Sequence, residues 1–182
     1  MTTNTKIVTY DDYLTLPDDG KKYEIIDGEL IMTPSPLSVH QRILRNLVRI
    51  FDTYVSKNRL GEVLFAPLDV ILSMTDVVQP DFIFVPQDRS DIITKKNIIA
   101  APDLVIEILS ESTETLDRVT KKGLYERYGV KEYWIVDPSA RTVEQYVLEN
   151  KSYRSVGTFK EHDVVEVKTI EGLPVKLSEI FE

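Results

Sequence analysis

The chain contains the run Leu104-Val105-Ile106-Glu107-Ile108-Leu109, in which one glutamate stands among aliphatic residues. A short apolar run of this kind, bounded by Pro102 and Ser110, predicts a β-strand that is buried on both faces. Burying an ionised carboxylate is costly unless a partner neutralises it or its pKa rises. Packing gives no reason for Glu107 in such a strand, so the residue points to chemistry.

A second carboxylate, Asp81, opens the run Phe82-Ile83-Phe84-Val85, which also predicts a buried strand. If the two strands are neighbours, the carboxylates meet, and at about 4 Å they repel by roughly 4 kcal/mol at an effective dielectric constant near 20. One of them is then protonated, or a cation lies between them, and Mg²⁺ suits such oxygen ligands. The structural alternative is that Asp81 caps a turn and Glu107 pairs with a buried lysine or arginine.

Composition limits the classes of protein to consider. The chain has 182 residues, 42% of them hydrophobic, which suits one domain over residues 1–182. It has no apolar stretch near the roughly 18 residues that a membrane helix needs, and its start lacks the apolar core of a signal peptide. We therefore expect no membrane partner. The absence of cysteine excludes disulfides and favours a cytoplasmic location, and two histidines argue against an all-histidine zinc site.

The net charge of −8 argues against tight, non-specific binding to nucleic acid, although residues 38–59 carry five basic residues against one acidic residue, a net of +4. A helix over 39–57 is predicted, with Ser38 and Gln41 in the spacing of a capping box. Its apolar stripe contains His40 together with Ile43, Leu44, Leu47, Phe51 and Tyr54. The opposite side carries Arg42, Arg45 and Arg49, which either follow a phosphate backbone or form an ordinary solvated face.

A second helix is predicted over residues 113–128. One stripe of it contains Asp117, Lys121, Leu124, Tyr125 and Tyr128. Lys122 and Glu126 lie on another side, with the spacing of an exposed ion pair. Because the helix follows the Glu107 strand, Lys121 should face the same sheet. A lysine there either neutralises the carboxylates or orients a water molecule and stabilises a developing anion.

The remaining elements complete an α/β pattern. Strands are expected near 62–72, 80–85, 103–109 and 132–138, and a short helix after Thr9. Residues 23–32 predict a hairpin that turns at Asp27-Gly28. Residues 141–170 predict a β meander with a turn near 150–151, and residues 177–181 a short closing helix.

This order of strands and helices resembles the core of the PD-(D/E)XK nuclease superfamily, and the segments are similar to its Uma-type restriction endonuclease family over residues 10–140. The matching pieces are Tyr23-Glu24-Ile25-Ile26-Asp27-Gly28-Glu29-Leu30, Pro36 with His40, Pro80-Asp81-Phe82-Ile83-Phe84-Val85, Ala101 to Ser110, Asp117, Lys121, Tyr125, Gly129-Val130 and Glu132 to Pro138. The resemblance implies a restriction-endonuclease-like mixed β-sheet flanked by helices, with an extra N-terminal hairpin and a C-terminal β meander.

The resemblance also implies a site. Asp81 and Glu107 would be the acidic pair of the nuclease motif and would hold Mg²⁺ or Mn²⁺ together with the carbonyl of Ile108. The motif lysine is expected two residues after Glu107, where Leu109 stands, and in this branch Lys121 takes its role. The resemblance adds Glu24, as a further acidic residue, and His40 to the candidate site residues.

The function that follows is a metal-dependent endonuclease that hydrolyses phosphodiester bonds in DNA. A homodimer is expected on family grounds, because cleavage of both strands usually needs two sites. The alternative is a catalytically silent nuclease fold that binds protein or nucleic acid, which the net charge of −8 and the missing local lysine favour. A closer alternative is a hydrolase of RNA or of small nucleotides.

Overall fold

A six-stranded mixed sheet forms the centre of the protein in the computed structural model, which describes residues 7–17 and 19–182. The strand order is β10-β9-β8-β7-β6-β3. The strands are β3 (Gly61–Phe65), β6 (Phe82–Pro86), β7 (Leu104–Ile108), β8 (Glu132–Asp137), β9 (Thr142–Glu149) and β10 (Ser152–Lys160). Strands β7 and β8 are parallel, and the other neighbouring pairs are antiparallel.

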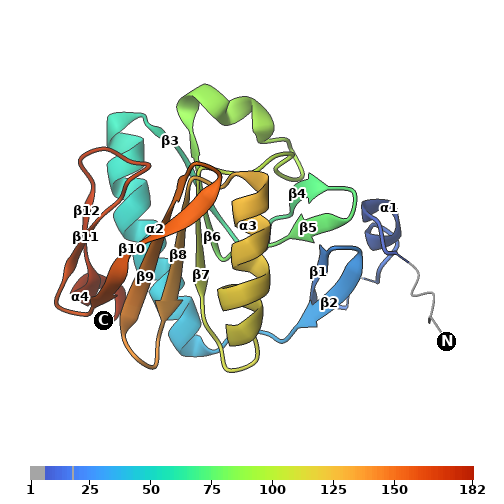
Figure 1. Ribbon diagram of the computed structural model, residues 1–182, viewed down its shortest axis with the longest axis horizontal. Coiled ribbons are helices and arrows are strands. Elements are labelled where there is room, and N and C mark those ends of the chain that lie inside the picture. Colours follow the sequence, from blue (N-terminus) through green and yellow to red (C-terminus); the bar gives the residue numbers. More distant parts are fainter. Residues whose placement is uncertain (1–6, 18) are drawn as a thin grey trace.

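Helices α2 (Ser38–Asn58) and α3 (Lys122–Tyr128) cover opposite faces of this sheet (Figure 1). Side chains alternate along β7, so Leu104, Ile106 and Ile108 pack in the core beneath α2. Val105 and Leu109 pack in the other core, with Leu124 and Tyr125 of α3. Glu107 shares the α3 side by the same alternation, although it stands among apolar residues.

A second sheet of four strands, in the order β2-β1-β5-β4, carries the N-terminal hairpin. Its strands are β1 (Lys22–Ile26), β2 (Glu29–Thr33), β4 (Val70–Ser73) and β5 (Asp76–Val78). The hairpin turns at Asp27 and Gly28, whose φ angles of 50° and 76° fit the predicted turn. The hairpin is therefore part of a larger sheet, because Ile25 of β1 pairs with Val77 of β5.

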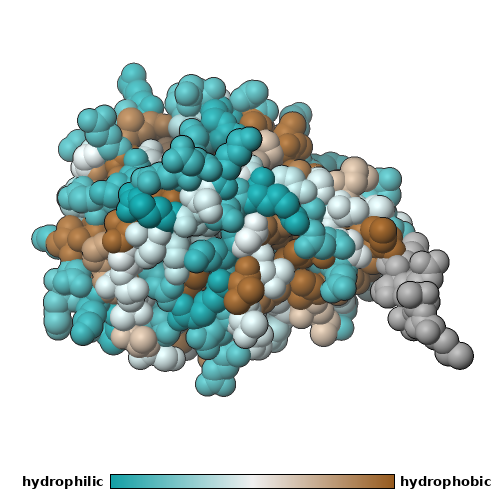
Figure 2. All heavy atoms as spheres, viewed as in Figure 1, coloured by the Kyte–Doolittle hydropathy of each residue, from teal (hydrophilic) through white to brown (hydrophobic). Residues whose placement is uncertain are grey.

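The other elements are short. They are α1 (Tyr10–Tyr13), the 3₁₀ segment η1 (Gln87–Ile92), the π-helical segment η2 (Leu116–Lys121), β11 (Val164–Glu166), β12 (Pro174–Lys176) and α4 (Leu177–Ile180). In the view of Figure 2 the surface is mostly hydrophilic, with hydrophobic groups in separate places. The predicted fold class, a mixed sheet flanked by helices, is confirmed. One domain over residues 1–182 stays a prediction.

Two local predictions were wrong. The capping box is one, because α2 begins at Ser38 itself and Leu37, which has no polar side chain, precedes it. The strand predicted over 62–72 is instead β3 and β4, which belong to different sheets and are separated by a segment with the cis peptide bond Ala66-Pro67. The helix predicted over 113–128 is present, but its first part, η2, is π-helical, and this wider turn has no signature in the sequence.

Candidate active site

Antiparallel pairing of β6 and β7 brings Asp81 and Glu107 together. The ladder between these strands ends at the pair Phe82 and Ile106, so Asp81 lies beside the last residues of β7. The backbone N–H of Ile108 donates to Asp81 Oδ2 at 2.8 Å, and the N–H of Asp81 donates to Glu107 Oε2 at 3.3 Å. In a strand the N–H and C=O of one residue point to the same side, so the Ile108 carbonyl also faces Asp81. The two strands are neighbours, and each carboxylate accepts a backbone hydrogen bond from the segment that carries the other.

Lys121 lies at the centre of a buried charge cluster, and the prediction that it faces the sheet is confirmed. Its Nζ atom is 3.1 Å from Glu107 Oε1, 3.1 Å from Glu24 Oε2 and 3.5 Å from Asp117 Oδ1. The residue is only 2% exposed. Burial lowers the pKa of Lys121, but the three carboxylates raise it more, so its pKa stands well above the usual lysine value. Lys121 therefore stays charged across the physiological pH range.

Glu107 has a perturbed proton affinity. Its Oε1 atom accepts a hydrogen bond of 2.6 Å from the Tyr125 hydroxyl in addition to the one from Lys121. Burial raises the pKa of Glu107, Lys121 lowers it and Asp81 raises it again, which gives a pKa of about 7. The carboxyl group is thus balanced between its two protonation states near neutral pH.

Asp81 is shifted in the opposite direction. His40 Nε2 lies 3.0 Å from Asp81 Oδ2, and His40 is buried at the start of α2. Burial raises the pKa of Asp81, but the hydrogen bond with His40 and the charge of Lys22 lower it more, so the pKa is below the usual aspartate value. The two adjacent carboxyl groups therefore differ in proton affinity, a pattern that often separates catalytic roles.

Lys22 is a site residue that the sequence analysis missed. Its Nζ atom lies 3.9 Å from Glu24 Oε1 and 3.9 Å from Asp81 Oδ1. Lys22 and Glu24 are two residues apart on β1, so their side chains share a face of the strand. That spacing was visible in the sequence. Asp117 and Tyr125 were placed on the correct helix stripe, but they were not included among the site residues.

The cluster has an excess of negative charge. Four carboxylates, from Glu24, Asp81, Glu107 and Asp117, face the ammonium groups of Lys22 and Lys121. The formal excess is two negative charges when all six groups are ionised, and burial raises the pKa of Asp117 as well. The buried atoms Glu24 Oε2 and Asp117 Oδ1 accept no hydrogen bond within the described residues. Such a cluster can accommodate further positive charge.

The donor set was tested for a divalent ion. Within residues 7–17 and 19–182, no group of three or more Asp, Glu or His side chains is arranged to hold one metal ion. Mg²⁺, however, is commonly held by one or two carboxylates, with waters and substrate phosphates as the other ligands. Asp81, Glu107 and the Ile108 carbonyl supply oxygen atoms of this kind, so these residues fit a sparsely liganded Mg²⁺ or Mn²⁺ site.

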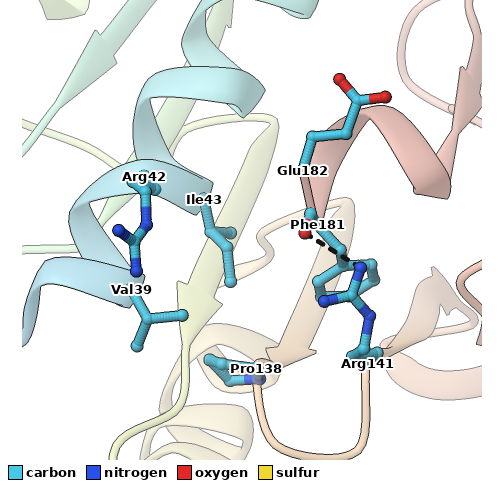
Figure 3. Close-up of a pocket in the computed structure, with 7 residues that line it drawn as sticks. All are labelled: Val39, Arg42, Ile43, Pro138, Arg141, Phe181 and Glu182. Atoms are coloured by element: carbon cyan, nitrogen blue, oxygen red, sulfur yellow. Dashed lines mark hydrogen bonds between the residues drawn. The ribbon is translucent and has the colours of Figure 1, made fainter.

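Both carboxylates of the site are buried, so the site is closed to solvent. Asp81 is 7% exposed and Glu107 is 2% exposed. Two cavities of the described chain lie elsewhere. One, of about 220 Å³, lies between Arg42 and Ile43 of α2 and Pro138, Arg141 and the C-terminal residues (Figure 3). The other, of about 390 Å³, is lined by Asp103, Lys131, Val147, Leu148, Lys168 and Thr169.

The basic face of α2 is exposed as predicted, at Arg42, Arg45 and Arg49. Arg45 donates to the Asn46 side chain, whereas Arg42 reaches the edge of the 220 Å³ cavity (Figure 3). Across the described residues, no helix is both long enough and apolar enough to span a membrane.

The predicted ion pair of Lys122 with Glu126 was wrong. Lys122 Nζ lies 3.7 Å from the centre of the Tyr146 ring, and Glu126 accepts a hydrogen bond of 3.0 Å from Ser152. Both side chains therefore contact the hairpin of β9 and β10, which packs beside α3 and was not placed there from the sequence.

The central sheet with helices on both faces is the fold of a restriction-endonuclease-like nuclease. The chain belongs to the Uma2 family, described as "Putative restriction endonuclease", which matches it over residues 10–178. A solved structure from Anabaena variabilis, described as a "putative nuclease belonging to DUF820", has the same fold with a TM-score of 0.80. That match has 22% identity and covers 96% of this chain and 97% of that chain.

A protein of Synechocystis sp. (strain ATCC 27184 / PCC 6803 / Kazusa), described as "Uncharacterized protein sll1609", is 26% identical over 145 residues. The match covers 78% of this chain and 81% of the relative. The predicted family is thus confirmed. Restriction-endonuclease-like families generally use a divalent metal ion.

Proposed function

We propose that this protein is a metal-dependent endonuclease that hydrolyses phosphodiester bonds in DNA. The observation that carries the proposal is the contact of Asp81 with Glu107 and the Ile108 backbone, with opposite pKa shifts on the two carboxyl groups. Asp81, Glu107 and the Ile108 carbonyl would hold Mg²⁺ or Mn²⁺. A bound ion would supply Lewis-acid activation of the phosphate and of water.

Each side chain of the site has its own proposed role. Asp81 stays ionised because its pKa is low, and it keeps a fixed orientation because Ile108 and His40 both contact Oδ2. Glu107 would hold the ion through its carboxylate, whose Oε1 is oriented by hydrogen bonds from Lys121 and Tyr125. Lys121 fixes Glu107 Oε1 and supplies a permanent positive charge where negative charge would grow on the phosphate. Glu24 holds Lys121 in place.

DNA is the proposed partner. The exposed arginines of α2 are the proposed phosphate contacts, on the helix whose first turn also brings His40 to Asp81. A homodimer is proposed for cleavage of both strands. The interface would have to leave this basic face open.

The test is cleavage of plasmid and of single-stranded DNA with Mg²⁺ or Mn²⁺. We expect cleavage by the wild type and by Glu149→Gln, an exposed control on β9, and loss of cleavage with Asp81→Asn, Glu107→Gln or a chelator. RNA and dinucleotides are assayed in parallel. Equal cleavage by Glu107→Gln and Glu149→Gln would exclude the proposed site.

A second candidate is a catalytically silent binding module. The observation that favours it is burial: Glu107 is 2% exposed, and its charge is already balanced by Lys121. Calorimetry with Mn²⁺ separates the two functions. A silent module should bind no Mn²⁺ through these carboxylates, whereas the nuclease should bind it in the wild type and lose it in Asp81→Asn.

A further inference from the structure

Lys22 is placed differently from the other lysine of the cluster. Lys121 is 2% exposed and has three carboxylates within 3.5 Å. The Lys22 side chain is 25% exposed, and its two ion pairs, both 3.9 Å, are longer than hydrogen bonds. The close contacts of the Lys121 ammonium are thus with buried carboxylates, whereas the ammonium of Lys22 reaches both the cluster and solvent.

The backbone fixes this position. Lys22 is the first residue of β1 and pairs with Thr33 of β2, so its Cα is held in the four-stranded sheet. Strand alternation directs Lys22 and Glu24 to the same side, and Glu24 is completely buried against Lys121. The stem of Lys22 therefore runs from the solvent edge of the cluster toward Asp81 Oδ1. Ile108 contacts the other oxygen, Oδ2.

A phosphate that approaches Asp81 meets a repulsive surface. The cluster carries a formal excess of two negative charges, and the substrate adds another. A partly exposed ammonium can contact a phosphate oxygen while it remains near the aspartate, whereas Lys121 would have to leave its three carboxylates. Exposure, reach and charge together single out Lys22 as the lysine that can meet the substrate.

We propose that Lys22 binds the substrate phosphate on which the site acts, through an ion pair with a non-bridging oxygen. This inference rests on the proposed nuclease function and names a residue that touches the substrate. Lys22 would be the lysine that contacts the phosphate, whereas Lys121 would supply its charge from the buried cluster beneath it. The competing explanation is that Lys22 only balances the charges of Glu24 and Asp81.

The first experiment measures DNA binding without cleavage, with Ca²⁺ in place of Mg²⁺, by fluorescence anisotropy at several salt concentrations. Lys22→Gln should weaken binding about tenfold and reduce the slope of log K against log[salt] by about 0.9, as expected for one lost phosphate contact on duplex DNA. Lys22→Arg should restore the slope. The matched control is Lys21→Gln, which removes a neighbouring lysine that is 53% exposed and pairs with Asp19; it should behave as wild type.

The second experiment needs no variant and so does not depend on the folding of one. Lysines of the wild type are acetylated with and without DNA and quantified by mass spectrometry. DNA should protect Lys22 several-fold and leave Lys21 unprotected. Equal acetylation of Lys22 in both conditions, or a Lys22→Gln salt slope equal to that of Lys21→Gln, would overturn the inference and leave the charge-balance explanation.

The outcomes also separate this inference from the proposed function. If the wild type cleaves DNA with Mg²⁺ but Lys22→Gln keeps the wild-type cleavage rate and salt slope, the nuclease stands and the Lys22 contact fails. In the opposite case the wild type cleaves no DNA, while DNA still protects Lys22 from acetylation and Lys22→Gln still lowers the salt slope. That result would refute the nuclease function and support Lys22 as a phosphate-binding residue.

Discussion

Two buried glutamates, Glu132 and Glu107, lie on neighbouring strands but have very different surroundings. Glu132 on β8 is completely buried, and its Oε1 accepts from Trp134 Nε1 and Gln145 Nε2, both at 2.7 Å. Its Oε2 accepts from the Lys168 and Thr169 backbone N–H groups and the Thr169 hydroxyl. Glu107 on β7 is 2% exposed, but it contacts a lysine and has like-charged neighbours.

Burial alone therefore does not identify an active site. The donors around Glu132 are neutral, and they link β8 to the segment before β12, as a structural carboxylate would. The groups around Glu107 are mostly charged, and its pKa rises to about 7 because burial and nearby carboxylates outweigh Lys121. Perturbed proton affinity with charged partners is the better indicator.

The largest effect is expected for Glu132→Ala. The change leaves several buried donors without an acceptor, at about 1–3 kcal/mol each, so we expect a loss of about 4 kcal/mol or more in the free energy of unfolding. Urea denaturation measures it, with Glu107→Gln as the matched variant that keeps its fold. If Glu132→Ala were stable and Glu107→Gln unfolded, Glu107 and not Glu132 would be the structural carboxylate.

The second prediction concerns pH. Burial raises the pKa of Glu107 from 4.5 to about 7, so the folded protein holds this proton more tightly than the unfolded chain. The stability that this proton contributes is complete below the unfolded pKa and is lost as pH rises through the folded pKa. Between about pH 5 and pH 8, the wild type should lose on the order of 3 kcal/mol relative to Glu107→Gln. Denaturation of both proteins at the two pH values measures this, and parallel pH profiles would contradict it.

Lys121→Ala should lower cleavage by a factor on the order of 10² or more, because one preorganised charge is removed from the site. Lys122→Ala is the control and should change little, since Lys122 contacts the Tyr146 ring on the hairpin side. Mn²⁺ binding should survive in Lys121→Ala, because a lysine supplies no metal ligand. Single-turnover kinetics and calorimetry test both parts, and equal rates for the two variants would remove Lys121 from the mechanism.

The smallest effect is expected at the surface. Replacement of Arg42, Arg45 and Arg49 by alanine should reduce the slope of log K against log[salt] for DNA binding by about 2–3, if each contacts a phosphate. Anisotropy titrations measure the slope, and Lys57→Ala, an exposed change in the last turn of α2, is the control. An unchanged slope would show that the arginines are an ordinary solvated face.

The elements that the sequence predicted well are those with a strong local pattern. Apolar runs located β6, β7 and β8, and helical periodicity placed Lys121 on the inward side of its helix. The elements that it missed depend on distant partners. β5 has only three residues and forms by pairing with β1 and β4, and the split of 62–72 between two sheets is decided by tertiary packing.

The same reasoning applies to the site. The family resemblance indicated Asp81 and Glu107, and the inward side of the helix predicted over 113–128 indicated Lys121. The structure brings these three residues together. Lys22 was missed because its importance depends on where the N-terminal sheet docks, and a single sequence does not encode that position locally. The closed state of the cluster was also not predictable, because it depends on how β1, the start of β6, β7 and η2 pack.

The contact of Glu24 with Lys121 also has a consequence for the timing of synthesis. Glu24 leaves the ribosome early and Lys121 much later, after β6 and β7 have been made. A growing chain that stops before η2 carries Glu24, Asp81 and Glu107 without the cation that neutralises two of them. A complete charge cluster therefore needs η2, and the nascent chain cannot hold one until Lys121 has been made.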